Sequence, residues 1–164
     1  MSVQIKNQPY EHTKYQKVFD TYPFELSDFQ KWAIEAIHEK KNVMITAFTG
    51  SGKTLPAEEA IKFYHSIGKK SIYCSPVKAL TNEKYDSFSK KFPEITFGIF
   101  TGDNKDNPEA DCLLMTTEIL ANNLKHIKDE KESGLLDFNM DYHNDLGVVI
   151  FDEFQYLFSD RGAA

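Results

Sequence analysis

The sequence contains few cysteines, almost no arginine and no long hydrophobic run. Its two cysteines, Cys74 and Cys112, have neither the spacing of a zinc site nor the number needed for a disulfide framework, so we expect both to be small buried residues. The uninterrupted apolar runs, such as Val148 to Phe151, fall far short of the roughly 20 residues that a membrane span needs. The first ten residues also lack the apolar core of a signal peptide. We therefore expect no membrane partner and an intracellular location, cytoplasmic or nuclear.

Arginine is nearly absent, because the 19 basic residues comprise 18 lysines and Arg161. Against 25 acidic residues they leave a formal net charge of −6. This balance argues against a surface that holds nucleic acid by bulk electrostatics, so any polynucleotide must be held by local contacts. A reaction that needs several arginine side chains must receive them from elsewhere.

The 164 residues suffice for about one domain, and 41% hydrophobic with 27% charged residues is an ordinary globular composition. Apolar runs of strand length alternate with amphipathic stretches, a pattern that predicts an α/β fold with a parallel sheet. Ser27 and Gln30 form a capping-box pattern that opens the first of these helices. Further helices are expected at residues 53–66, 76–88 and 117–124. Strands are expected at 43–47, 71–75, 95–100, 112–115 and 147–151, and the first and last of them are expected to be buried. Residues 125–145 are polar, and we expect a loop or a loosely held helical excursion there.

Residues 47–54, with the sequence Ala-Phe-Thr-Gly-Ser-Gly-Lys-Thr, have the pattern of a phosphate-binding P-loop between a strand and a helix. Glycine lets the backbone wrap closely around a polyphosphate and point its N–H groups inward. Lys53 would reach the β- and γ-phosphates, and Thr54 would hold Mg²⁺. The alternative is a Gly-Ser turn with an exposed lysine. The loop predicts an ATP site formed by Thr49, Gly50, Ser51, Gly52, Lys53 and Thr54.

Asp152 and Glu153 follow the last expected strand, and ligands of parallel sheets bind at the carboxyl ends of strands. Asp152 would bind Mg²⁺, and Glu153 would orient or deprotonate the attacking water. An Asp-Glu pair after a strand is also a common helix-capping turn. Its position about one hundred residues after a P-loop favours the nucleotide site.

Five segments resemble motifs of superfamily-two helicases and have the order and spacing of that family. Within it they resemble the superkiller-like DExH group, which includes exosome-assisting RNA helicases. They are Phe24-Glu25-Leu26-Ser27-Asp28-Phe29-Gln30, the P-loop, residues 75–85, Thr101-Gly102-Asp103 and residues 107–120. The resemblance covers Phe24 to Gly162. It implies a RecA-like P-loop NTPase domain with a mostly parallel central sheet flanked by helices. It also implies Mg²⁺ and ATP as cofactors, and RNA as the partner.

The resemblance also implies roles for individual residues. Gln30 would bind the adenine edge and Phe24 would pack on the base, whereas their local patterns equally fit a capping box and a core aromatic. A second set would contact the sugar-phosphate backbone through hydroxyls and backbone donors: Pro76, Lys78, Thr101, Gly102, Thr116 and Thr117. A β-turn at residues 101–103 and a helix N-cap at Thr116 or Thr117 are the local alternatives.

Gln155 stands where the DExH group has histidine. Glutamine can still donate and accept hydrogen bonds near the γ-phosphate, so we expect the ATPase to survive with Lys53, Asp152, Glu153 and Gln155 as its catalytic residues. Coupling to RNA is the property that this change puts in question.

We expect residues 1–23 to be an N-terminal extension, and residues 24–164 to be the first RecA-like lobe, truncated before the second. The second lobe of the same parent chain would supply the arginine fingers, so we expect the fragment alone to be nearly inactive. The RNA would be single-stranded or carry a 3′ or 5′ tail, and an exosome-type complex is a further expected partner.

Three alternatives remain open at this point. The lobe could belong to a DNA helicase or translocase of the same superfamily, which RNA and single-stranded DNA would distinguish as ATPase activators. It could be a non-catalytic module that binds nucleotide or RNA, as Gln155 suggests. A nucleotide kinase would need an arginine-rich lid, which a chain with one arginine does not supply.

Overall fold

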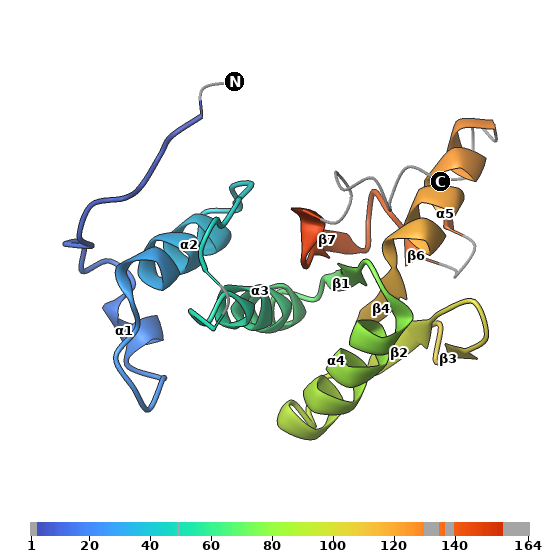
Figure 1. Ribbon diagram of the computed structural model, residues 1–164, viewed down its shortest axis with the longest axis horizontal. Coiled ribbons are helices and arrows are strands. Elements are labelled where there is room, and N and C mark those ends of the chain that lie inside the picture. The colour runs from blue at the N-terminus through green and yellow to red at the C-terminus, as the bar shows by residue number, and fades with distance from the viewer. Residues whose placement is uncertain (1–2, 49, 130–134, 137–139, 156–164) are drawn as a thin grey trace. The chain divides into compact units, whose positions relative to one another are not determined.

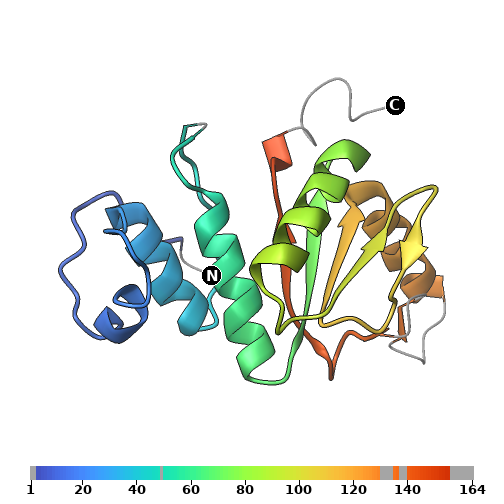
Figure 2. The ribbon, with the colours of Figure 1, turned by 90° about the horizontal axis from the view of Figure 1, so that it is seen from below.

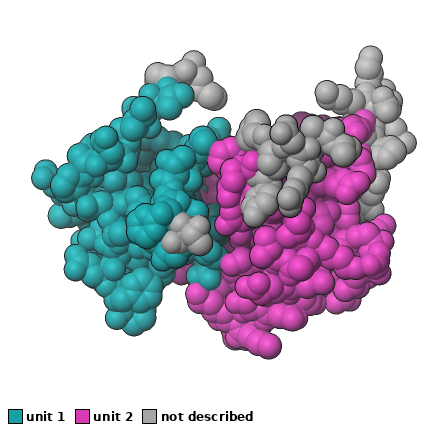
Figure 3. Space-filling view, viewed as in Figure 1, with its two compact units in different colours: residues 1–60 teal, residues 61–164 magenta. Residues whose placement is uncertain are grey.

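The computed structural model describes residues 3–48, 50–129, 135–136 and 140–155 (Figure 1). The chain divides into two compact units, residues 1–60 (unit 1) and 61–164 (unit 2), which Figure 3 shows in different colours. Each unit is described by itself below. The α/β class, with a mostly parallel sheet flanked by helices, is confirmed.

Unit 1 is built from helices. It contains α1 (Gln16–Phe19), α2 (Asp28–His38) and the first turns of α3 (Thr54–Ser66). The capping box predicted at the start of α2 is confirmed, since the Ser27 N–H donates to Gln30 Oε1 at 2.9 Å. Phe19, Leu26 and Ile34 form the apolar cluster that joins α1 to α2.

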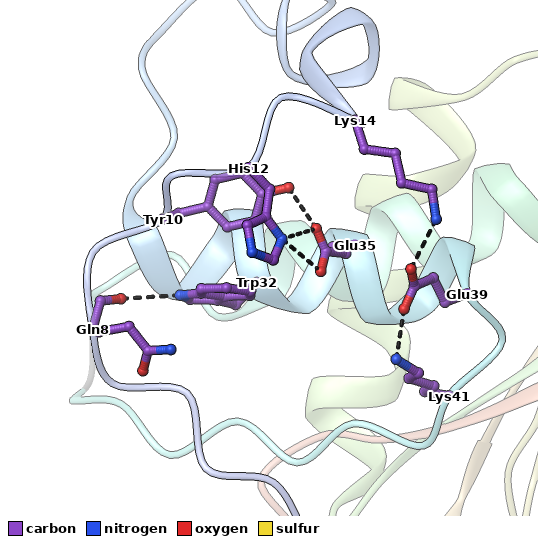
Figure 4. A network of polar contacts seen from close by, with 8 residues as sticks. All are labelled: Gln8, Tyr10, His12, Lys14, Trp32, Glu35, Glu39 and Lys41. Atoms are coloured by element: carbon purple, nitrogen blue, oxygen red, sulfur yellow. Dashed lines mark hydrogen bonds and ion pairs between the residues drawn. The ribbon is translucent and has the colours of Figure 1, made fainter.

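The segment before α1 lies along α2 and is held there by side chains (Figure 4). The Trp32 indole N–H donates to the Gln8 carbonyl at 3.0 Å, and the Tyr10 hydroxyl donates to Glu35 at 2.7 Å. Farther along, Glu39 accepts hydrogen bonds from Lys41 and Lys14, which lower the pKa of its carboxyl to about 2. These contacts fix residues 8–14 against the helix that carries Gln30.

Unit 2 contains a five-stranded sheet in the order β3-β2-β4-β1-β7, parallel except for the antiparallel pairing of β3 with β2. The three inner strands β2, β4 and β1 are almost entirely buried, which explains why the sequences of β2 and β4 are nearly continuous apolar runs. The strands are β1 (Lys70–Ser75), β2 (Phe97–Phe100), β3 (Lys105–Asp106), β4 (Cys112–Thr116) and β7 (Leu146–Phe151).

Helices α4 (Lys78–Lys91) and α5 (Thr117–Asp129) cover opposite faces of this sheet (Figure 2). Alternation along β1 explains the two layers, because successive side chains of a strand point to opposite faces. Tyr73 packs edge-on against Phe88 of α4, with ring centroids 5.3 Å apart. Ile72 and Cys74 join the cluster that contains Leu120 of α5. Both cysteines are free and buried, as predicted.

The buried strand predicted at residues 43–47 is wrong. This segment has no regular secondary structure, and Val43 and Met44 are 39% and 70% exposed. Its nearly continuous apolar residues fit a buried strand, but a strand forms only where another strand pairs with its backbone. In the described part of the chain, no pairing includes these residues.

The expectation of a loop or helical excursion at residues 125–145 is wrong in part. Helix α5 continues to Asp129, and a short antiparallel pair follows, formed by β5 (Leu135–Leu136) and β6 (Met140–Asp141). Met140 is fully buried in the cluster beneath α5. Met140, with Tyr142 packed against the same cluster, therefore anchors a stretch whose polar composition predicts exposure.

Candidate nucleotide and nucleic-acid site

The predicted P-loop lies in unit 1, immediately before α3. Gly50 and Gly52 have φ angles of +83° and +85°, a region that side chains other than glycine rarely adopt. Helix α3 begins at Thr54, directly after the loop, and the Leu55 N–H donates to the Gly52 carbonyl at 3.2 Å. Thr49, the remaining predicted loop residue, lies outside the described residues. This backbone fits a polyphosphate, which needs N–H donors and close access to the main chain.

Hydrogen bonds within the loop hold it closed on itself. The Ser51 hydroxyl donates to the Phe48 carbonyl at 2.7 Å, and the Lys53 ammonium donates to the Ala47 carbonyl at 2.9 Å. The lysine therefore reaches back across the loop, where a phosphate oxygen could replace a neutral carbonyl as its acceptor. Such an exchange is favourable, because the ammonium then meets an opposite charge in place of a neutral dipole.

Gln30 contacts this loop from α2. Its Oε1 accepts from Ser27, and its Nε2 donates to the Gly52 carbonyl at 3.1 Å, so both ends of the amide are engaged while the residue is buried. Gln30 thus forms the predicted capping box, and it also contacts the P-loop, which the sequence did not predict. Phe24 is not the core aromatic that its local pattern allowed, because it is 54% exposed. Contact of either residue with adenine stays a prediction.

A second buried group in unit 1 escaped the sequence prediction. Glu59 of α3 accepts a hydrogen bond from the Tyr22 hydroxyl, and its Oε1 lies 3.0 Å from His38 Nε2 at the end of α2. Burial, followed by the hydrogen bond to Glu59, raises the pKa of Tyr22 above its usual range. The carboxylate thereby joins the P-loop helix to α2 and to the segment before it.

In unit 2, the carboxyl ends of four neighbouring strands place most of the remaining predicted residues at one edge of the sheet. Thr101 follows β2, Thr116 ends β4, Pro76 follows β1 and Asp152 follows β7. Because the strands are adjacent and parallel, these positions lie side by side. The Asp152 N–H donates to the Cys74 carbonyl at 2.8 Å, which extends the pairing of β7 with β1 to this edge.

Asp152 has a partner in the neighbouring strand that the sequence did not reveal. The hydroxyl of Tyr73 donates to Asp152 Oδ2 at 2.6 Å, and Tyr73 is fully buried. A tyrosine within a buried strand looks like a packing residue in the sequence. The register of β1 with β7 places Tyr73 opposite Ile150, so that its hydroxyl reaches Asp152 at the end of β7.

Glu153 and Gln155 contact each other. The Gln155 amide donates to Glu153 Oε2, and Glu153 has a φ of +51°, which is uncommon for a residue other than glycine. Residues held in sparsely populated backbone conformations concentrate at functional sites. Glutamine in place of histidine therefore touches the residue for which we predicted a role in orienting water.

The predicted nucleic-acid residues divide into exposed and buried ones. Lys78, the first residue of α4, forms an ion pair with Asp103 in the turn after β2. That turn is present as one of the local alternatives predicted, with the Thr101 N–H donating to the Asn104 carbonyl at 2.8 Å. Thr101 is 3% exposed, and its hydroxyl has no hydrogen-bond partner within the residues that the structure describes. Thr117 donates to the Ser75 carbonyl at 3.3 Å, which links the ends of β4 and β1.

The predicted metal donors are the Thr54 hydroxyl in unit 1 and the Asp152 carboxylate in unit 2. This donor chemistry fits Mg²⁺, which prefers oxygen ligands and uses one or two carboxylates together with substrate phosphates and water. Within the described ranges, no three His, Cys, Asp or Glu side chains gather into a metal-binding group. No helix in the same part of the chain is long and apolar enough to cross a bilayer.

Comparison with known proteins adds a family and several relatives. The sequence model of a family described as DEAD/DEAH box helicase matches residues 27–164. The chain is 41% identical to the antiviral helicase SKI2 of Saccharomyces cerevisiae over 143 residues, which are 87% of this chain and 10% of SKI2. It is 37% identical to the exosome RNA helicase MTR4 of Homo sapiens over 147 residues, which are 89% of this chain and 13% of that protein. The chain thus spans about a tenth of the length of the curated relatives it matches.

Proposed function

Because the chain belongs to the DEAD/DEAH box helicase family, we propose that it is the ATP-binding lobe of an ATP-dependent RNA helicase. The helicase would couple hydrolysis of Mg²⁺-bound ATP to movement along RNA or to its unwinding. The observation that carries the proposal is the loop at residues 50–54, in which two glycines with positive φ precede Lys53 and the start of α3. The hydrogen bond from Gln30 Nε2 to the Gly52 carbonyl of this loop supports an adenine site next to the phosphates.

Each predicted residue has one chemical task in this proposal. Lys53 would exchange the Ala47 carbonyl for the β- and γ-phosphates, and Gly50, Gly52 and the start of α3 would offer N–H donors. Thr54 and Asp152 would hold Mg²⁺, which neutralises charge on the phosphates. Glu153 would orient the attacking water or take up its proton, with Gln155 holding the carboxylate that does so.

RNA is the proposed track because the name of one relative, exosome RNA helicase, specifies RNA. A row of hydroxyls and helix N-termini at the sheet edge suits a phosphate backbone without requiring a basic protein. DNA is the other outcome of the test below. A non-catalytic module would instead bind ATP, and neither RNA nor DNA would stimulate its hydrolysis.

Further parts of the proposal concern the complete protein. Residues 24–164 would form the first RecA-like lobe, residues 1–23 an extension, and a second lobe in the same parent chain would close on the nucleotide. An exosome-type assembly is the proposed protein partner, on the ground of the similarity to an exosome RNA helicase. An intracellular location, cytoplasmic or nuclear, stays a prediction.

The test is steady-state ATP hydrolysis by the complete polypeptide with single-stranded RNA, with single-stranded DNA and with neither. Stimulation by RNA that is lost in Lys53→Ala supports the RNA helicase. Equal or greater stimulation by DNA supports a DNA translocase instead. Nucleotide binding without stimulated hydrolysis leaves a binding module, and Gln155→His is then the first reversion to make.

A further inference from the structure

The hairpin formed by β2 and β3 carries two acidic residues, Asp103 in its turn and Asp106 in β3, and both contact α4 through different partners. Asp103 pairs with the ammonium of Lys78, and Asp106 accepts a hydrogen bond from the Tyr85 hydroxyl at 3.1 Å. Both carboxylates are exposed. Replacing either aspartate by asparagine therefore removes one negative charge from the same hairpin. Only Asp103 contacts a residue of the proposed RNA track, namely Lys78.

Lys78 and Asp103 form an ion pair where an anionic backbone would have to bind. Lys78 begins α4, whose first turn carries no acidic residue and whose N–H groups favour an anion. The Asp103 carboxylate offers the same kind of acceptor as a phosphate, namely negatively charged oxygens. Side-chain exposures of 45% for Lys78 and 78% for Asp103 leave the pair open to exchange with an incoming ligand.

A second observation points to a ligand at this place. Thr101, two residues before Asp103, has a buried hydroxyl for which the described residues provide no hydrogen-bond partner. A buried polar group without a partner is costly, and it is satisfied when a polar ligand or water reaches it. The unpaired hydroxyl and the ion pair thus lie in one turn, at the carboxyl end of β2.

We propose that Asp103 is an internal competitor of the RNA phosphate for Lys78. This inference rests on the proposed RNA-binding function. RNA engages Lys78 only by displacing Asp103, so that one ion pair is exchanged for another and the net gain from the contact is small. The carboxylate then recaptures the lysine whenever a phosphate leaves. Such a residue weakens the grip on each phosphate, which suits a protein that must release and rebind a strand at every step.

The test is a double-mutant cycle on the complete polypeptide, with binding of a fluorescent single-stranded RNA as the readout. Asp103→Asn should tighten RNA binding about two- to fivefold, the range expected when an exposed ion pair of up to about 1 kcal/mol is removed as a competitor. Asp106→Asn, the matched control in the same hairpin, should leave the affinity unchanged. In a Lys78→Met background, Asp103→Asn should have no further effect. A gain in affinity cannot arise from a misfolded variant.

Two results overturn the inference while the proposed function stands. Equal tightening by Asp103→Asn and Asp106→Asn would show a general charge effect, and tightening that persists in Lys78→Met would show that the lysine is not the target. An unchanged affinity of Asp103→Asn has the same meaning, provided that the unmutated protein binds RNA. If the unmutated protein neither binds RNA nor is stimulated by it, the proposed function itself is wrong and the inference falls with it.

Discussion

The phenol of Tyr73 donates a 2.6 Å hydrogen bond to Asp152, and so connects strand β1 with the carboxylate predicted to hold Mg²⁺. Asp152 is also held by its own N–H on the Cys74 carbonyl. Both contacts come from β1, so the position of this carboxylate depends on how β7 pairs with β1. Residues that orient a metal ligand affect metal binding nearly as strongly as the ligand does.

Tyr73→Phe should therefore weaken the response to Mg²⁺. The ring would still pack on Phe88, but Asp152 would lose one of its two restraints. We expect the Mg²⁺ concentration for half-maximal ATP hydrolysis to rise about tenfold, as is typical for loss of a residue that orients a metal ligand. Tyr85→Phe, which removes the contact of a half-buried tyrosine with Asp106, is the matched control. Identical Mg²⁺ titrations for Tyr73→Phe and the unmutated protein would contradict the positioning role.

The neighbouring P-loop glycines should differ in their tolerance of alanine. Both have positive φ, but a Cβ at Gly52 would lie 2.6 Å from Gln30 Nε2, whereas one at Gly50 meets nothing within 4 Å. Gly52→Ala should thus displace the buried amide and lower the free energy of unfolding by about 1–2 kcal/mol more than Gly50→Ala. Urea unfolding of the two variants compares them directly. An equal decrease in the free energy of unfolding for both variants would contradict the prediction, because the Gln30 side chain would then move aside without loss of stability.

Lys78→Met should weaken RNA binding without changing its sequence preference, because a phosphate contact is independent of the base. Loss of one phosphate contact should also reduce the slope of log affinity against log salt concentration by about 0.7. Lys90→Met, at the opposite end of α4, is the control. A slope that is the same for both variants and the unmutated protein would place Lys78 away from the track.

Alkaline pH should destabilise unit 2 through its two thiols. Burial raises the pKa of Cys74 to about 12, and burial likewise raises the pKa of Cys112. A thiol in the unfolded chain titrates near about 8.5, so above that pH the unfolded state releases protons that the folded state keeps. The free energy of unfolding should therefore be constant below about pH 8 and fall above about pH 9.

Urea unfolding between pH 7 and pH 10 measures this effect. Each thiol can contribute at most about 1.4 kcal/mol per pH unit, and the double variant Cys74→Ala, Cys112→Ala should show a flatter profile. A decline of the same steepness in the double variant would assign the alkaline sensitivity to other groups.

The 164 residues alone should hydrolyse ATP very slowly. An arginine that stabilises the transferred phosphate contributes roughly 10³–10⁵ in rate, and Arg161 is the only arginine of the sequence. Turnover by the fragment, compared with that of the complete polypeptide, measures what the remainder supplies. Comparable rates would show that the fragment holds every catalytic group it needs.

Features encoded in short stretches of sequence were predictable. The capping box at Ser27 and Gln30, the helix after the P-loop and the buried strand at 70–75 appear at or within two residues of the predicted bounds. The five motifs also identified the helicase family that the comparisons confirm. In each case the pattern lies within one segment.

Features that depend on distant pairing were not predictable. Residues 43–47 have the composition of a strand and yet pair with none of the described strands, whereas Tyr73 lies opposite Ile150 only because β1 and β7 adopt one register. The same holds for Glu59, whose partners Tyr22 and His38 are 37 and 21 positions away. A sequence shows that such residues are polar but not which partner each one meets.

The clamp of residues 8–14 on α2 gives the molecule an optical reporter of its own. Trp32 is the only tryptophan of the sequence. Its indole donates to Gln8, and Tyr10 and His12 of this segment meet its ring edge-on. The ammonium of Lys6, just before the segment, lies 4.5 Å from the ring centre. Detachment of the segment would hydrate the indole and shift its emission. The emission of Trp32 would therefore follow the attachment of this segment to α2 without any added dye.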